Sequence, residues 1–525
     1  MSSSADFAHD RDGNPSGVSE STALLRHSIE TADNDNDNDS VASGPQTPLP
    51  PKEKRRVLAL LCAFAFTMML GDNLQPAAIT QVFETVICDD YYKTHSAVAP
   101  GPPHGDRCQV PAVQKELALV RGFQQMAPLL PGLLCTVPYG LLADRVGRKR
   151  VLILSGAGVT FALCWVMLVC YLRFAPLRWV LFSGAFLFIG GGDAVTSSVL
   201  HVMVTDTTTR AERAQVFLYL HAADVVSGFF GPAISGALME AGYTWLALLL
   251  AALVLFSGTF ILSYFIPETL HLANEVSGEP SDHPRPGDSL SSAPGHKKGK
   301  KKHILSTIST AFAPLLGVLR SNRQGVLLLA IFAPQTSARE LFTVIGLQYS
   351  KAKFALSYAR GNVLLSLFQG AQGMFVLVLL PALTRAVAEP RGWSDWTRDR
   401  RYAIASIAGT ALGLLVIAAA PVLAVELIGL LLVSLGSCTT GLLMSLLGGV
   451  LKPGQVSALY STALMLSMVS RSITAPVVSA LLTAGMDLGW AWMGLPFAVM
   501  AILMAGIAVA SGFIQKKKPE HTSED

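Results

Sequence analysis

The segment GLLADRVGRKR at residues 140–150 decides the fold, because it places a basic cluster between two apolar runs that are each long enough to cross a bilayer. Loops rich in Lys and Arg stay on the cytoplasmic side of a membrane, so this cluster predicts a short cytoplasmic turn between two membrane helices. Its basic residues are Arg145, Arg148, Lys149 and Arg150.

Asp144 and two glycines distinguish this turn from an ordinary basic loop. Gly140 is expected to let two helices approach closely, and Gly147 to permit the reversal of the chain. A carboxylate among so many cations predicts a specific partner, either a neighbouring arginine or the positively polarised N-terminus of another helix. We expect Asp144 to reach the helix that begins near Pro453 and Gly454, and to act there as a latch between conformations.

The composition places the chain in a lipid bilayer. Its 525 residues are 51% hydrophobic and only 14% charged, and its mean hydropathy is +0.46. A soluble protein of this length carries more charge. The formal net charge of +4 is small and the basic residues gather in short loops, so these residues indicate topology and not binding to nucleic acid.

The pattern G-x-x-x-D-R-x-G-R-K resembles the signature loop that the major facilitator superfamily carries between its second and third transmembrane helices. The matching positions are Gly140, Asp144, Arg145, Gly147, Arg148 and Lys149. The resemblance implies an all-α membrane fold of twelve transmembrane helices in two pseudo-symmetric bundles of six. It also implies secondary transport by alternating access, and the chain looks most like the fungal efflux branch for drugs and secondary metabolites.

Apolar runs predict where the twelve helices lie. In the first half they are expected at residues 57–82, 117–142, 151–172, 180–204, 215–239 and 245–266. In the second half they are expected at residues 325–348, 362–383, 402–420, 425–450, 455–482 and 490–514.

These helices divide the chain into five parts. Residues 1–55 and 515–525 are cytoplasmic tails, residues 56–270 and 321–514 are the two bundles, and residues 271–320 are a cytoplasmic linker. The first tail is polar, so it cannot bury a core and is expected to be disordered. The linker ends in an apolar stripe at residues 304–319, which predicts an interfacial helix.

Helices four and five contain unusual small-residue segments. Helix four carries three glycines at residues 190–192 beside Asp193, a composition that lowers helix stability and allows close approach of backbone or ligand. Helix five carries SGFFGPAISG at residues 227–236, which is similar to the antiporter signature of the superfamily, although Ser227 and Ser235 replace two glycines. The similarity favours proton antiport, and a simple small-residue packing face is the alternative.

Ionisable residues inside the apolar runs are the candidates for proton coupling, because an unpaired charge is expensive in hydrocarbon. Asp224 is the first candidate, since His221 lies three residues away on the same helical face and could relay a proton. Asp72 and Asp193 are the alternatives. Structural ion pairs would explain the same residues without a role in transport.

Other polar residues in the apolar runs are expected to line a cavity for a small organic molecule. They are the amides Asn73, Gln124, Gln125, Gln369 and Gln372, the bases Arg339 and Arg471, and the acid Glu340.

Cys88 and Cys108 fall in the longest outer loop, residues 87–115, and could form a disulfide in an oxidising compartment. The other cysteines show no metal-ligand spacing, so no metal site is expected.

No phosphate-binding loop, zinc-binding helix or hydrolase elbow occurs in the sequence, so we expect a transporter and not an enzyme. It should need no cofactor and use a proton gradient. Its expected partners are a small organic substrate, protons and the lipid bilayer, with no nucleic acid, and it should function as a monomer. The cell membrane is the expected location, with the vacuolar membrane as the alternative.

Three other functions stay open. Resemblance to vertebrate proton-coupled folate carriers favours uptake of a nutrient or organic anion by symport. A non-transporting membrane sensor and a membrane-embedded transferase could share many of the helices.

Overall fold

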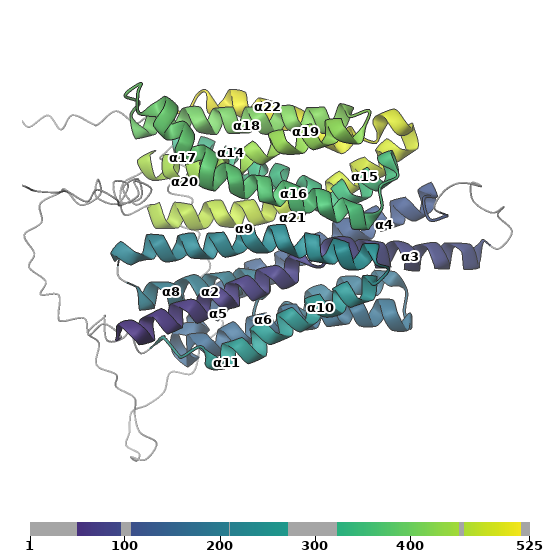
Figure 1. Ribbon diagram of the computed structural model, residues 1–525, viewed down its shortest axis with the longest axis horizontal. Helices are drawn as coiled ribbons and strands as arrows, with labels where there is room; N and C mark the ends of the chain where they lie inside the picture. Colours follow the sequence, from purple (N-terminus) through teal and green to yellow (C-terminus); the bar gives the residue numbers. More distant parts are fainter. Residues whose placement is uncertain (1–49, 96–106, 209, 271–322, 451–455, 516–525) are drawn as a thin grey trace, which may run out of the picture.

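Long helices that run nearly side by side supply the regular secondary structure of the described residues (Figure 1). The computed structural model describes residues 50–95, 107–208, 210–270, 323–450 and 456–515. The predicted linker, the interfacial helix at residues 304–319 and most of both tails lie outside these ranges.

The first half of the chain contains α-helices joined by short 3₁₀ and π-helical turns. They are α2 (Pro51–Asn73), α3 (Pro76–Thr94), α4 (Pro111–Met126), α5 (Leu129–Val146), α6 (Arg148–Leu172), η1 (Leu177–Phe182), α7 (Ser183–Phe186), α8 (Gly192–Thr207), α9 (Arg210–Glu240), α10 (Thr244–Phe256), η2 (Ser257–Leu262) and α11 (Ser263–Phe265).

The second half has the same character. Its elements are α14 (Arg323–Leu341), η3 (Phe342–Gly346), α15 (Leu347–Phe354), α16 (Tyr358–Met374), η4 (Phe375–Leu379), α17 (Leu380–Leu383), η5 (Thr384–Ala388), α18 (Asp395–Ala419), α19 (Leu423–Ser434), η6 (Leu435–Cys438), α20 (Thr439–Val450), α21 (Val456–Leu488), η8 (Trp490–Trp492) and α22 (Leu495–Ser511).

Ten helical stretches of the described residues are long and apolar enough to cross a membrane. Two further helical segments, residues 177–207 and 323–354, stand at the places predicted for the fourth and seventh spans. In the first segment, glycines break the helix. In the second, charged residues that include Arg339 and Glu340 lower the hydropathy of a continuous helical stretch. The all-α membrane fold is confirmed, whereas the count of twelve spans stays a prediction.

Two hydrophobic cores occupy the two halves of the chain. One core draws mainly on residues 57–266 and the other on residues 328–514. The halves meet along two helix pairs, α4 with α21 and α9 with α16. Gly122 permits the first approach, because a Cβ there would lie 2.7 Å from Ser479 Oγ.

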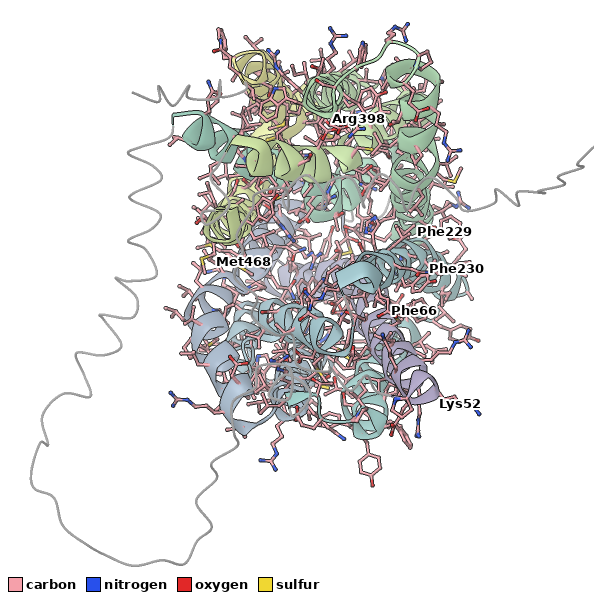
Figure 2. All side chains as sticks on the ribbon, turned by 90° about the vertical axis from the view of Figure 1, so that its left-hand side faces the viewer. Lys52, Phe66, Phe229, Phe230, Arg398 and Met468 are labelled. Atoms are coloured by element: carbon pink, nitrogen blue, oxygen red, sulfur yellow. A yellow bond between two sulfur atoms is a disulfide. The ribbon has the colours of Figure 1, made fainter. Side chains whose placement is uncertain are left out.

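The two ends of the bundle differ in what they hold. We call the end that carries residues 140–150 the inner end and the opposite end, which carries Cys88 and Cys108, the outer end. Figure 2 looks onto the inner end, with Lys52 on the first half, Arg398 on the second, and Phe229 and Met468 near the boundary between them.

The first membrane helix is longer than predicted. The sequence predicts it at residues 57–82, but α3 continues to Thr94. An interruption falls before Pro76, because proline has no N–H to donate and its ring displaces the preceding turn. The helix continues outward because its next residues, including Ile87 and Cys88, are buried. The outer loop predicted at residues 87–115 is therefore corrected at both ends, because residues 87–94 belong to α3 and residues 111–115 belong to α4.

A disulfide joins Cys88 to Cys108 and so connects the end of α3 to the segment before α4.

Helix four is broken at its glycines. Gly190, Gly191 and Gly192 have backbone φ angles of +83°, +83° and +62°, which residues other than glycine rarely adopt. A Cβ on Gly190 would lie 2.3 Å from the backbone nitrogen of Ser155 on α6, so the break packs directly against α6. Because α8 begins at the break, Asp193 stands in its first turn.

Candidate functional site

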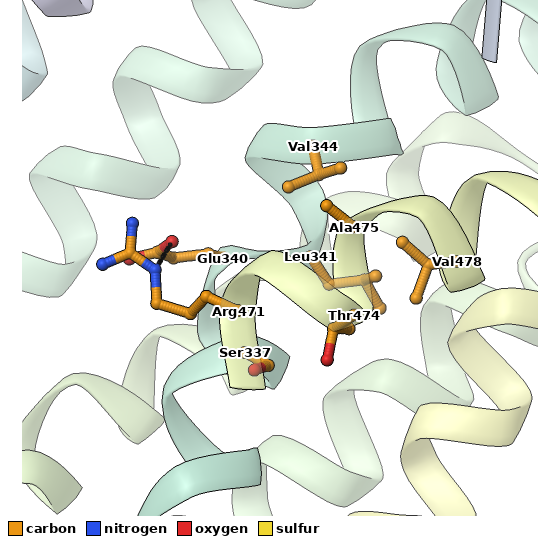
Figure 3. Close-up of a pocket in the computed structure, with 8 residues that line it drawn as sticks. All are labelled: Ser337, Glu340, Leu341, Val344, Arg471, Thr474, Ala475 and Val478. Carbon is orange, nitrogen blue, oxygen red and sulfur yellow. Dashed lines mark ion pairs between the residues drawn. The ribbon is translucent and has the colours of Figure 1, made fainter. Parts of the chain in front are cut away.

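An ion pair inside the second half is the best-defined part of the candidate site (Figure 3). Arg471 on α21 places its Nε 2.6 Å from Glu340 Oε2 on α14. The Arg471 side chain remains 51% exposed, so it can also interact with a group that enters between the halves. A small pocket around the pair is lined in addition by Ser337, Leu341, Val344, Thr474, Ala475 and Val478.

Two carboxylates of the first half face this pair. Asp193 lies close enough to Arg471 for electrostatic attraction, and Asp72 on α2 lies close enough to Asp193 for repulsion. Asp72 Oδ1 also accepts a hydrogen bond of 3.2 Å from Gln75 Nε2. Asp193 and Glu340 thus both interact with the Arg471 guanidinium, and Asp72 lies beside Asp193. A proton or a cationic group can compensate the excess negative charge of these carboxylates.

A second charged group lies between α9 and α14. Asp224 and His221 are both exposed on one face of α9. His221 and Arg339 of the opposite half both lie within electrostatic range of Asp224. The predicted acid and histidine are therefore joined by an arginine from the other half of the chain.

One amide pair connects the halves beside these charges, and further amide contacts lie within the first half. Gln369 Nε2 donates to Asn73 Oδ1 at 3.3 Å, and Asn73 Nδ2 lies 3.4 Å from Ser227 Oγ. Gln124 Oε1 accepts from Arg121 at 2.7 Å.

Two other predicted amides have no such role in this state. Gln125 and Gln372 are half-buried, and their side chains make no hydrogen bond to the residues that the structure describes.

Comparison with known proteins identifies the family. Residues 112–394, which make up more than half of the chain, match the family described as Major Facilitator Superfamily. The chain belongs to this superfamily. The resemblance carried by residues 140–150 is thus confirmed.

Fungal transporters are among the similar proteins. The "MFS efflux pump atnC" of Emericella nidulans is 29% identical over 478 residues, which cover 89% of each chain. The "MFS-type transporter avaK" of Aspergillus versicolor is 28% identical over 433 residues, which cover 82% of this chain and 86% of that one.

Solved structures of transporters share the fold. A bacterial homologue of the human lysosomal transporter Spinster, in an inward-facing and unoccupied conformation, has a TM-score of 0.56 at 13% identity, and the match covers 90% of this chain and all of that one. A POT family transporter in complex with a thioalcohol-conjugated peptide has a TM-score of 0.57 at 13% identity, over 86% of this chain and 95% of that one. This facilitator is a multi-pass membrane transporter.

The signature loop of the facilitator is organised by a residue outside it. Glu268, which follows α11, accepts hydrogen bonds from the backbone nitrogens of Arg148 at 2.9 Å and Lys149 at 3.1 Å. It thereby caps the N-terminus of α6. The Arg148 guanidinium forms a buried ion pair with Asp206 at the end of α8.

The other loop residues lie as follows. Gly147 has a φ of +113° and makes the predicted reversal. The Lys149 Nζ donates to the Tyr264 carbonyl at 2.7 Å, and Arg145 is exposed. The prediction for Gly140 is wrong, because a Cβ there would meet no atom of the described residues within 4 Å, so no close approach requires a glycine at this position.

Asp144 pairs locally in this state. Its Oδ1 lies 3.6 Å from Arg148 Nη2, and its side chain is 61% exposed. Pro453 and Gly454, its predicted targets, lie outside the described residues. The latch therefore stays a prediction.

Several buried polar residues at the outer end have no place in the sequence predictions. They are Glu84, Gln114, Arg121, Gln348, Lys351 and Tyr358. Glu84 was missed because it follows the predicted end of helix one at residue 82. A charge flanked by apolar residues on both sides was the available signal for Glu84.

Proposed function

We propose that this facilitator exports a small organic molecule in exchange for protons. The observation that carries the proposal is the excess of carboxylates where the halves meet: Asp193 interacts with Arg471 of the Arg471–Glu340 pair, and Asp72 lies beside Asp193. Such a site can hold either a proton or a polar group of the substrate, and that competition is what antiport requires. The efflux pumps among its relatives support the outward direction.

The contacts between the halves are consistent with loading from the inner side. Among the described residues, the polar contacts that join the halves extend from the outer end to the Gln369–Asn73 bond. This distribution of contacts supports the inference of an inward-open arrangement, in which a cytoplasmic molecule approaches Asp224 and Arg471.

The first prediction assigns the proton to Asp224. Everted vesicles with an acidic interior should accumulate the substrate when tested with a panel of cationic and neutral fluorescent compounds, because export then appears as uptake. Asp224→Asn removes the titrating group, so gradient-driven accumulation should fall by about tenfold or more. Binding, measured by quenching of tryptophan fluorescence, and downhill exchange should persist. Asp224→Glu should retain part of the activity.

Asp90→Asn is the matched control, because Asp90 is an exposed acid at the outer end that pairs only with nearby Lys93 in the described contacts. It should transport normally. Intact uphill transport in Asp224→Asn would move the proton to Asp72 or Asp193. Accumulation in right-side-out vesicles with an acidic exterior would instead indicate symport.

We place this transporter in the cell membrane. Microscopy of a fluorescently tagged chain tests this location. If the chain were found only on vacuoles, the proposed exchange would move the substrate into the vacuole.

A further inference from the structure

A buried carboxylate closes the outer end of the transporter. Glu84 on α3 is 4% exposed and accepts hydrogen bonds from Lys351 Nζ on α15, from Tyr358 OH on α16 at 3.1 Å, and from Gln114 Nε2 on α4. Lys351 and Tyr358 belong to the second half, whereas Glu84 and Gln114 belong to the first. The ion pair therefore spans the boundary that must open on the outer side during transport.

Neighbouring groups hold this contact in place. Gln348 Nε2 donates to the Gln114 carbonyl at 2.6 Å, and Lys351 Nζ lies 4.7 Å from the centre of the Tyr358 ring. In the ion pair, the side chains of Glu84 and Lys351 are only 5% and 10% exposed. Separating such a pair is costly if either charge is left buried without a partner.

A buried cation without a carboxylate lies on the same side of the boundary as Glu84. Arg121 on α4 is 6% exposed, and its Nη1 donates to the neutral Gln124. Its Nε has no hydrogen-bond partner, and no carboxylate among the described residues lies within ion-pair distance of it. The Tyr358 phenol, which donates to Glu84, also lies within electrostatic range of Arg121. A guanidinium in this position lacks its natural counter-ion in the present state.

We propose that Glu84, Lys351 and Arg121 form the outer gate of the transport cycle, with the Glu84 carboxylate paired to Lys351 when the gate is closed and to Arg121 when it is open. Opening carries Lys351 and Tyr358 away with the second half. Arg121 stays with Glu84 in the first half and replaces the lost cation. The exchange keeps the carboxylate compensated in both states, so the two states can have similar free energies. The inference rests on alternating access in the proposed function, but not on proton coupling or on the direction of transport.

Labelling of a reporter cysteine can test the gate directly. Ala359 is 6% exposed and packs against Gly236 of the first half near the outer end. Ala359→Cys, in a chain whose unpaired cysteines are replaced and whose disulfide is kept, should react slowly with a maleimide in lipid nanodiscs. Lys351→Met should speed that labelling by roughly tenfold or more, because the closed state loses its ion pair. Lys351→Arg should restore the slow rate.

Arg121→Met should have the opposite effect and slow the labelling severalfold, because the open state loses the cation that receives Glu84. Arg121→Lys should return the rate toward that of the parent. These opposite directions separate gating from mere damage to the fold, which would speed labelling in both variants. If Arg121→Met does not fold, Arg121→Gln serves the same comparison.

The matched control is Arg360→Met. Arg360 also joins the halves at the outer end, through a 3.4 Å contact with Glu240, but both side chains are exposed and such pairs contribute little. It should leave the labelling rate unchanged. Faster or unchanged labelling in folded Arg121→Met, or an unchanged rate in Lys351→Met, would overturn the gate. Because these rates need no substrate and no gradient, they stay informative even if proton antiport is wrong.

Discussion

At the scale of single residues, one carboxylate organises the inner face. Glu268 accepts from the backbone nitrogens of Arg148, Lys149, Thr269 and Leu270 at 2.9–3.1 Å. Glu268→Gln removes the charge and one acceptor oxygen, so it should lower the free energy of unfolding by about 1–2 kcal/mol, as loss of a helix cap does. The thermal midpoint in detergent measures this. Glu389→Gln, at an exposed site that follows η5 and lies at no helix N-terminus, should leave the midpoint unchanged, and equal midpoints for both variants would contradict the cap.

Residues differ in how visible their roles are in the sequence. Asp72, Asp193 and Asp224 could be selected because each stands inside an apolar run, where a charge needs an explanation. Glu268 could not be selected as a cap, because the N-terminus of α6 that it caps lies 120 positions earlier in the sequence and only the folded chain brings the two together. Glu84 was overlooked for a local reason, because the predicted helix ended before it.

At the scale of elements, the break in helix four positions Asp193. Gly190→Ala would place a Cβ 2.3 Å from the backbone of Ser155 at a φ of +83°. The strain and the displacement from α6 should together cost about 1–3 kcal/mol and should abolish most transport, because the first turn of α8 moves. Thermal unfolding in detergent measures the loss of stability, and substrate uptake into everted vesicles measures the loss of transport.

Gly242→Ala separates the two causes. Gly242 has a φ of +86°, but a Cβ there would meet nothing within 4 Å. This variant should therefore show a smaller loss of stability and normal transport. Equal losses in the two variants would mean that backbone strain, and not contact with α6, explains the effect.

Element type was predictable to a greater extent than element boundaries. Three consecutive glycines announce a weak helix, and the structure breaks at that point. The extension of α3 to Thr94 was not predictable from hydropathy, because the buried surface at its outer end is provided by packing and by the link to Cys108. The tight approach expected at Gly140 is absent, because no atom of the described residues would come within 4 Å of a Cβ at that position.

At the scale of the whole molecule, the inward-open arrangement that we infer accounts for the exposure of Asp144, whose side chain is 61% exposed and whose Oδ1 lies 3.6 Å from Arg148 Nη2. When the inner ends close, α5 approaches the second half, and the Asp144 carboxylate is expected to meet the N-terminal end of α21. Asp144→Asn should weaken that closed inner state. A charge at a helix end contributes about 0.3–1 kcal/mol, so turnover should fall by roughly two- to fivefold. Substrate binding from the inner side should be retained.

Labelling of the Ala359→Cys reporter should slow in Asp144→Asn, because a transporter that stays open inside keeps its outer gate closed. Asp395→Asn, at another exposed inner acid, should change neither rate. Normal turnover with normal labelling in Asp144→Asn would limit Asp144 to its local contact with Arg148.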